Sequence, residues 1–211
     1  SVMWAVIPIN SFLKTMTRLS KILDQNKRIE LTKMMADRMI NYLTNIPEIE
    51  KIVLLTNESK WVKTYHNNKI IHRKDKTSID LKENINLTAD WLYQQGVKQM
   101  LYVSIDLPFA EKNDLIELLN QHTKGLTIVE AKKDGGTNAL IIDLSYSMRF
   151  QFGKHSFEKH IRTAESLGIQ TNELQIEGLS FDLDDVDDWK DLIDRNSESD
   201  LVLNQFYEIQ K

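Results

Sequence analysis

Short apolar runs of strand length alternate with longer amphipathic segments along the chain, and this alternation constrains the fold more than any other feature. Apolar residues from 31 to 46 recur at helical spacing and predict a helix from about Gln25 to Leu43. Leu87 to Gln95 is followed by Gly96, a residue that commonly ends a helix. Strands that alternate with helices indicate an α/β fold, with a mainly parallel central sheet flanked by helices.

The remaining elements follow from the same patterns. The expected strands are Met3 to Ile9, Lys51 to Thr56, Asn68 to His72, Gln99 to Ser104, Leu126 to Ala131, Asn138 to Asp143, Leu174 to Ile176 and Ser180 to Leu183. The other expected helices are Glu111 to Gln121, Phe157 to Leu167 and Asp187 to Arg195, and the tail from Asp200 to Ile209 fits either a strand or a helix.

Composition narrows the class of protein. The 211 residues contain only three prolines and seven glycines and no low-complexity linker, so we expect a single domain over residues 1–211. A net charge of −4 argues against a nucleic-acid binder, and the lack of cysteine excludes disulfides and thiolate chemistry. No apolar run reaches the roughly 18 residues of a membrane helix. Without a recognisable secretion signal, the expected compartment is the cytoplasm.

Three aspartates predict a metal site. Asp182 and Asp184 are two residues apart in an expected strand, where residues i and i+2 point to the same face. Asp106 follows the apolar run from Met100 to Ile105, at the carboxyl end of another strand, where α/β sheets bind ligands. Adjacent carboxylates are costly unless a cation joins them, and oxygen ligands suit Mg²⁺. Mg²⁺ held by few carboxylates usually also binds substrate phosphates.

Two glycine-containing segments are candidate ligand-binding loops. Asp134 to Asn138 includes Gly135 and Gly136, which let a backbone approach a ligand closely, although a hairpin turn between two strands explains the same pattern. Phe152 to Phe157 precedes an expected helix, with Ser156 as a plausible N-cap. Helix N-termini bind phosphate, but an ordinary capped helix is the alternative.

The order of these motifs resembles the 2-phospho-L-lactate guanylyltransferase family, which acts in biosynthesis of the deazaflavin coenzyme F-420. The resemblance covers nearly the whole chain, and the run from Asp134 to Leu140 is its most diagnostic part. The other matching segments are Trp4 to Pro8, Thr17 to Leu19, Ile85 to Ala89, Ile105 to Pro108, Phe152-Gly153 with Ser156-Phe157 and His160, and Asp182 to Asp184.

The resemblance implies a nucleotidyltransferase fold related to glycosyltransferase type A enzymes. It implies Mg²⁺-dependent attack of a small phosphorylated acid on the α-phosphate of GTP, with release of pyrophosphate. The acceptor is 2-phospholactate, phosphoenolpyruvate or 3-phosphoglycerate in different members, and a homodimer is plausible. Carried over to this chain, Asp106, Asp182 and Asp184 would hold Mg²⁺, and Thr137, Gly153 and Ser156 would bind the acceptor. The residues that we expect to bind the nucleotide are Lys14, Arg18 and Asn86.

The chain departs from the family pattern at two positions. The family usually carries lysines where this chain has Asn10 and Met16. A triphosphate needs positive charge, and Lys14 and Arg18 are the nearby candidates, although Lys14 also fits a solvated surface residue. Two other functions therefore stay open. One is a nucleotidyltransferase with another nucleotide or acceptor, and the other is a binding or scaffold protein with a decayed nucleotide site.

Overall fold

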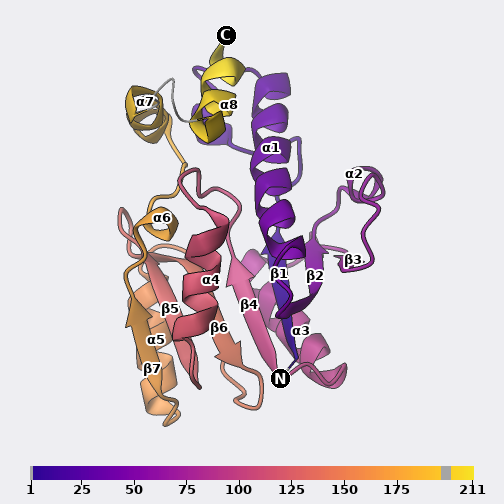
Figure 1. The fold of residues 1–211 in the computed structure, drawn as a ribbon, viewed down its shortest axis with the longest axis vertical. Helices are drawn as coiled ribbons and strands as arrows, with labels where there is room; N and C mark the ends of the chain where they lie inside the picture. Colours follow the sequence, from indigo (N-terminus) through magenta and orange to yellow (C-terminus); the bar gives the residue numbers. More distant parts are fainter. Residues whose placement is uncertain (1, 196–200) are drawn as a thin grey trace.

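A seven-stranded sheet in the order β3-β2-β1-β4-β6-β5-β7 forms the centre of the computed structural model, which describes residues 2–195 and 201–211 (Figure 1). Neighbouring strands from β3 to β4 are parallel, β6 runs antiparallel to β4 and β5, and β7 is parallel to β5. The mainly parallel sheet is therefore confirmed. The strands are β1 (Met3–Pro8), β2 (Ile49–Leu55), β3 (Ile70–Arg73), β4 (Gln99–Val103), β5 (Leu126–Ala131), β6 (Gly136–Asp143) and β7 (Thr171–Leu174).

Helices cover both faces of this sheet. Apolar side chains of α1, α4 and α6 pack on one face, and those of α3 and α5 pack on the other. No helix in the described residues combines the length and the apolar character needed to cross a bilayer. The helices are η1 (Thr17–Leu19), α1 (Gln25–Thr44), α2 (Ser59–Val62), α3 (Leu81–Gln94), α4 (Lys112–Gln121), α5 (Ser156–Ser166), α6 (Glu177–Ser180), α7 (Val186–Arg195) and α8 (Leu201–Gln210).

A third apolar cluster extends the fold beyond the sheet. It joins η1, the first half of α1, α7 and α8 through buried residues that include Leu19, Leu31, Trp189 and Phe206. Figure 1 shows α8 lying beside α1 at one end of the molecule. The tail is thus a helix, which decides between the two structures that its sequence allowed.

Side-chain caps set where the long helices begin. The carboxylate of Asp24 accepts a hydrogen bond from Lys27 N at 2.8 Å, and that of Asp80 accepts one from Glu83 N at 3.0 Å. Such caps satisfy backbone N–H groups that have no partner within the helix. Because Asp80 caps α3, this helix begins at Leu81, earlier than the expected Leu87.

The two strands expected at 174–176 and 180–183 are wrong. Strand β7 ends at Leu174, the next residues form the short helix α6, and residues 181–184 belong to no strand. Ile176 and Leu179 are both buried, Ile176 in the extended backbone just before α6 and Leu179 within it, and one helical turn is what brings both side chains to the core. The premise that Asp182 and Asp184 share a strand face therefore fails, and the tertiary structure must place them.

The run from Asp134 to Asn138 forms the turn of a hairpin. It connects antiparallel strands β5 and β6, and Gly135 adopts φ 69°, which glycine tolerates best. The hairpin interpretation is confirmed, and it places Thr137 and Asn138 at the start of β6. The N-cap prediction for Ser156 is wrong: α5 begins at Ser156 itself, and His155 precedes it in a left-handed conformation.

Candidate active site

One cavity lies at the carboxyl ends of the parallel strands β1 to β4. It has a volume of about 550 Å³, and we call it the edge cavity. In α/β sheets this edge is where ligands bind. Among its lining residues are Asn10, Lys14, Arg18, Asn57, Asp75, Tyr102, Asp106 and Asp184.

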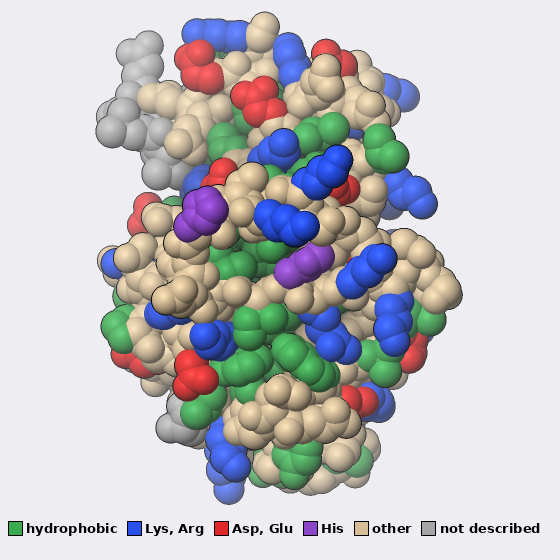
Figure 2. All heavy atoms as spheres, turned by 90° about the vertical axis from the view of Figure 1, so that its right-hand side faces the viewer, with side chains coloured by type: hydrophobic (Ala, Val, Ile, Leu, Met, Phe, Trp, Pro, Cys, Tyr) green, Lys and Arg blue, Asp and Glu red, His purple; other side chains and the backbone are tan. Residues whose placement is uncertain are grey.

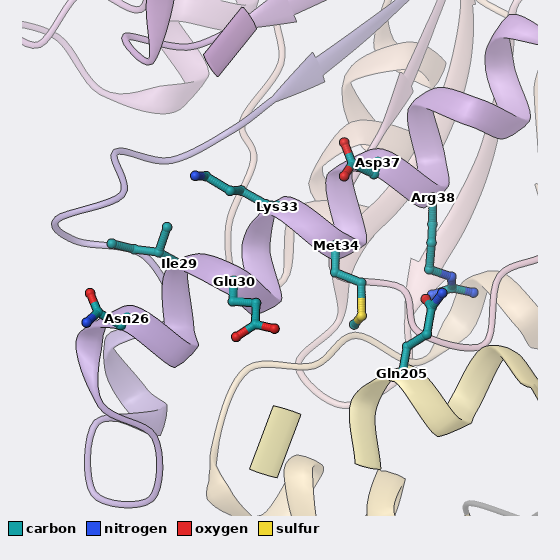
Figure 3. Close-up of a pocket in the computed structure, with 8 residues that line it drawn as sticks. All are labelled: Asn26, Ile29, Glu30, Lys33, Met34, Asp37, Arg38 and Gln205. Atoms are coloured by element: carbon teal, nitrogen blue, oxygen red, sulfur yellow. The ribbon is translucent and has the colours of Figure 1, made fainter. Parts of the chain in front are cut away.

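Another hollow of about 570 Å³ lies between α1 and α8 (Figure 3). Figure 3 shows the side chains of Arg38 and Gln205 extending toward one another between the two helices. Acidic Glu30 and Asp37 alternate with basic Lys33 and Arg38 along α1, so this hollow has no single sign of charge. None of the site residues expected from the sequence lines it. Asp182 lines a neighbouring hollow of about 760 Å³, whereas Lys14, Arg18, Asp106 and Asp184 all line the edge cavity, which is therefore the candidate site.

The end of β4 is joined to the segment that carries Asp182 and Asp184. The backbone N–H of Leu183 donates to Asp106 O at 2.8 Å. The Oδ2 atom of Asp188 accepts hydrogen bonds from Asp184 N at 2.9 Å and Asp185 N at 3.0 Å, and it also binds Lys133 Nζ. These contacts fix the conformation of the segment beside Asp106, although no strand forms there.

The carboxylates in this region repel one another. Burial, opposed by a hydrogen bond from the Ser104 hydroxyl and reinforced by the charges of Asp184 and Asp134, raises the pKa of Asp106 to about 6. Burial and then the charge of Asp106, followed by those of other aspartates, raise the pKa of Asp182 to about 7. A cation bound here would relieve this repulsion.

The fit of these aspartates to a metal rests on Asp182. Its Oδ1 atom is buried and has no hydrogen-bond partner among the described residues, so it is available to a cation. Asp184 instead forms an ion pair with Arg18 at 2.8 Å. Within residues 2–195 and 201–211, no three His, Cys, Asp or Glu side chains are grouped closely enough to hold a metal ion. The chemistry of the side chains fits Mg²⁺, while the three-aspartate ligand set stays a prediction.

The expected nucleotide-binding residues separate into two groups. Lys14 and Arg18 line the edge cavity together with Asp106 and Asp184. Asn86 is not brought to this cavity, because its buried amide exchanges two hydrogen bonds with the backbone of Phe150, at 2.8 and 3.2 Å. Its nucleotide-binding role stays a prediction.

The expected acceptor-binding residues lie together beside the β5–β6 hairpin. Thr137 Oγ1 is 2.9 Å from Ser156 Oγ and 3.0 Å from Nδ1 of His160. Nε2 of His160 accepts a hydrogen bond from Gln151 N at 2.9 Å, so Nδ1 carries the proton of the neutral ring and donates to Thr137. Ser156 is fully buried, whereas Gly153 is exposed with φ 121°. A ligand would thus meet Gly153 and the edge of Thr137 first.

Two residues that we did not expect connect the two halves of the site. Tyr102 lines the edge cavity, and its ring stacks on Phe152 at 4.2 Å, next to Gly153. The carboxylate of Asp134 accepts from Gly136 N at 2.8 Å and contributes to the raised pKa values of Asp106 and Asp182. Tyr102 lies in an apolar strand pattern, which gives no signal of a site. Asp134 lies in the loop of residues 134–138, whose expected ligand-binding role rested on Gly135 and Gly136 and not on this carboxylate.

Comparison with known proteins identifies the family. The family model described as "Guanylyl transferase CofC like" matches residues 3–201. The chain belongs to this family. Membership makes the protein a nucleotidyltransferase and confirms the resemblance found in its motifs.

Individual members of this guanylyl transferase family show how far the similarity extends. The phosphoenolpyruvate guanylyltransferase of Sphaerobacter thermophilus is 24% identical over 189 residues, which cover 89% of this chain and 91% of that protein. The 2-phospho-L-lactate guanylyltransferase of Methanosphaera stadtmanae is 24% identical over 192 residues, which cover 89% of this chain and 82% of that protein.

Solved structures support the fold of this family member. A protein assigned as a nucleotide-diphospho-sugar transferase from Desulfovibrio desulfuricans G20 superimposes with a TM-score of 0.79 at 16% identity, over 99% of this chain and 96% of that one. The 4-diphosphocytidyl-2C-methyl-D-erythritol synthase of Anaerococcus prevotii superimposes with a TM-score of 0.62 at 12% identity, over 100% and 97%. The nucleotidyltransferase fold expected from the resemblance is thus confirmed.

Proposed function

We propose that this protein transfers GMP from GTP to a three-carbon phospho-acid, with Mg²⁺, as a step in coenzyme F-420 biosynthesis. The observation that carries the proposal is the edge cavity, where Lys14 and Arg18 lie with Asp106 and Asp184. Tyr102 links this cavity to the group formed by Thr137 and Ser156. Family membership and the names of the two relatives support guanylyl transfer to phosphoenolpyruvate or 2-phospholactate.

In the proposed reaction, a phosphate oxygen of the acceptor bonds to the α-phosphorus of GTP. The bond from that phosphorus to the oxygen bridging the α- and β-phosphates breaks, and pyrophosphate leaves with the electron pair. The attacking oxygen is already anionic, so no strong general base is required. Catalysis then depends on positioning and on neutralising charge.

The residues of the chain have separate roles in this proposal. Lys14 and Arg18 face the triphosphate, and a bound triphosphate would compete with Asp184 for the guanidinium of Arg18. The imidazole of His160 keeps the Thr137 hydroxyl in place for the acceptor. Asp106, Asp182 and Asp184 would hold Mg²⁺, which neutralises charge on the phosphates when it is bound.

The test is pyrophosphate release with Mg²⁺, using each of the four common nucleoside triphosphates against 2-phospholactate, phosphoenolpyruvate and 3-phosphoglycerate. The proposal predicts release with GTP alone. Release with a different nucleotide favours the alternative enzyme, and no release from the folded protein favours the decayed site. Asp184→Asn should remove most activity, whereas the matched control Asp187→Asn, in the exposed first turn of α7, should keep it.

The same preparation tests the remaining expectations. Sedimentation would show whether the protein forms the homodimer that the resemblance suggests. Lys14→Ala tests whether Lys14 takes over the role of the two family lysines that are absent at Asn10 and Met16. An unchanged KM for GTP would show that it does not.

A further inference from the structure

The edge cavity has two chemically different ends. Four parallel strands, in the order β3-β2-β1-β4, end along it, and each is followed by a polar residue that lines the cavity. Asp106 follows β4, Asn10 follows β1, Asn57 follows β2 and Asp75 follows β3. Neighbouring strands are about 4.8 Å apart, so the end at Asp75 is roughly 14 Å from the end at Asp106.

The basic residues at one end of the cavity suit the phosphates of a nucleotide, so its base would lie at the other end. Lys14 and Arg18 lie in the segment that follows β1, Asp106 follows β4, and Asp184 forms an ion pair with Arg18, so these charged residues belong to the β1 and β4 side of the cavity. The part near β2 and β3 contains Asn57 and Asp75 together with the aliphatic side chains of Ile79 and Leu81. Aliphatic walls with a few polar groups are typical of sites that hold a flat, uncharged ring.

The carboxylate of Asp75 is held firmly and keeps one oxygen available. Its Oδ1 atom accepts a hydrogen bond from Nδ2 of Asn84 at 2.6 Å. Asn84 is buried, and its amide also bonds the backbone of Lys76 in both directions, at 3.0 Å each. Within the described chain, Oδ2 of Asp75 receives no hydrogen bond. A fixed carboxylate with a free oxygen is suited to accept from a ligand.

Asn57 supplies a second acceptor, from the segment whose backbone pairs with that of Asp75. Its Oδ1 atom is buried and has no donor among the described residues. The backbones of the two segments run side by side, because Thr56 N donates to Arg73 O at 3.0 Å and Asp75 N to Thr56 O at 3.4 Å. A buried acceptor without a donor is unfavourable, and a ligand N–H would satisfy it.

Two neighbouring acceptors select one base. The pairing edge of guanine carries two adjacent donors, the N1–H and the 2-amino group. Adenine and cytosine offer one amino group beside an acceptor nitrogen, and uracil offers one N–H between two carbonyls. We propose that Asp75 accepts from the 2-amino group of guanine and Asn57 accepts from its N1–H, with Asn84 as the residue that positions Asp75. This inference rests on the proposed function and adds the residues that choose the nucleotide.

The surface beside the β3 end of the cavity carries many basic side chains (Figure 2). Figure 2 shows many Lys and Arg side chains on the face that lies at the right of Figure 1, where α2 and β3 lie. Exposed lysines of this region include Lys60, Lys63, Lys74 and Lys76. In a chain with net charge −4, such a surface would steer a polyanionic nucleotide toward the edge cavity as a whole.

The experiment compares kcat/KM for GTP, inosine triphosphate and xanthosine triphosphate, with whichever of the three acceptors the wild-type protein uses. Inosine triphosphate lacks the 2-amino group, so the wild-type kcat/KM for this nucleotide should be about 10- to 100-fold lower than that for GTP. Asp75→Asn should lose GTP activity and gain xanthosine triphosphate activity, because its amide N–H can donate to the 2-oxo group of xanthine. The ratio of the two activities should shift by at least about 100-fold.

The matched control is Asp187→Asn, the same substitution in the exposed first turn of α7, which should leave that ratio unchanged. A folded Asp75→Asn protein that keeps the wild-type preference overturns the inference. If Asp75→Asn does not fold, Asn57→Ala replaces it, tested with GTP against the triphosphate of 2,6-diaminopurine riboside, which keeps the 2-amino group but lacks the N1–H. An unchanged preference for GTP over that nucleotide overturns the inference as well. A wild type that uses a nucleotide other than GTP refutes the proposed function itself, which is a distinct result.

Discussion

The buried imidazole of His160 should make the protein less stable as the pH falls. His160 is fully buried, and its ring lies 5.0 Å from Phe152 and 5.7 Å from Phe150. Burial lowers its pKa from 6.5 to about 4. A proton on Nε2 would meet the N–H of Gln151, which donates to that atom in the folded protein. Protonation therefore favours the unfolded chain.

The magnitude follows from linkage. Between about pH 6.5 and pH 4, the unfolded histidine is protonated and the folded one is not, so the unfolded state binds more protons and stability falls as the pH is lowered. A difference of about 2.5 pKa units corresponds to about 3 kcal/mol when complete, and about 2.5 kcal/mol is reached at about pH 4.5. Above about pH 7.5 the group contributes no pH dependence.

Asp106 and Asp182 act in the opposite direction. Their pKa values are raised to about 6 and about 7, so the folded state binds more protons than the unfolded state, and this contribution to stability is lost as the pH rises. The pH dependence of the wild type alone is therefore a sum of opposing effects. The difference between the wild type and His160→Phe isolates the histidine.

The assay is urea denaturation of both proteins at several values from about pH 7.5 to about pH 4.5, without added metal. His160→Phe should be less stable at neutral pH, because the hydrogen bonds to Thr137 and Gln151 are lost. This deficit should shrink by about 2.5 kcal/mol at the acidic end. A deficit that stays constant across the range would refute the reasoning.

Two further predictions concern Asp182 and Asn86. At ten times its dissociation constant, Mg²⁺ should stabilise the wild type by about 1.4 kcal/mol and raise Tm by roughly 3–5 °C. This rise should be lost in Asp182→Asn and kept in Asp187→Asn, and an equal rise in all three would contradict the metal site. Asn86→Ala should lower the free energy of unfolding by about 1–3 kcal/mol, because the backbone N–H and C=O of Phe150 both lose the Asn86 side chain as their hydrogen-bond partner. Unchanged stability with a raised KM for GTP would instead support a nucleotide contact.

Much of the fold could be predicted because local patterns and tertiary packing agree in most segments. The spacing of apolar residues in α1 matches the face that it buries, including Leu31, Met35 and Met39. The segment after Leu174 shows the opposite case. Its apolar residues fit short strands by composition, but packing against the core turns them into α6, and Asp182 and Asp184 leave the strand that we expected.

Some residues of the candidate site could be predicted from the sequence and others could not, for a related reason. Glycine-rich and acidic motifs give strong sequence signals, and Thr137, Gly153 and Ser156 do lie together. The amide of Asn86 gives the same signal whether it binds a ligand or a neighbouring backbone, and only the structure shows it bonded to Phe150.

By itself, the sequence determined the class of fold and the family, because periodicity and motif order are properties of the chain, and it suggested three aspartates as candidate metal ligands. The tertiary structure decided that the edge cavity combines Lys14 and Arg18 with Asp106, and that Asp75 and Asn57 share its far end. Residues far apart in the chain meet there because parallel strands bring their carboxyl ends to one edge of the sheet. Which side chains share that edge depends on strand order, which no local pattern contains.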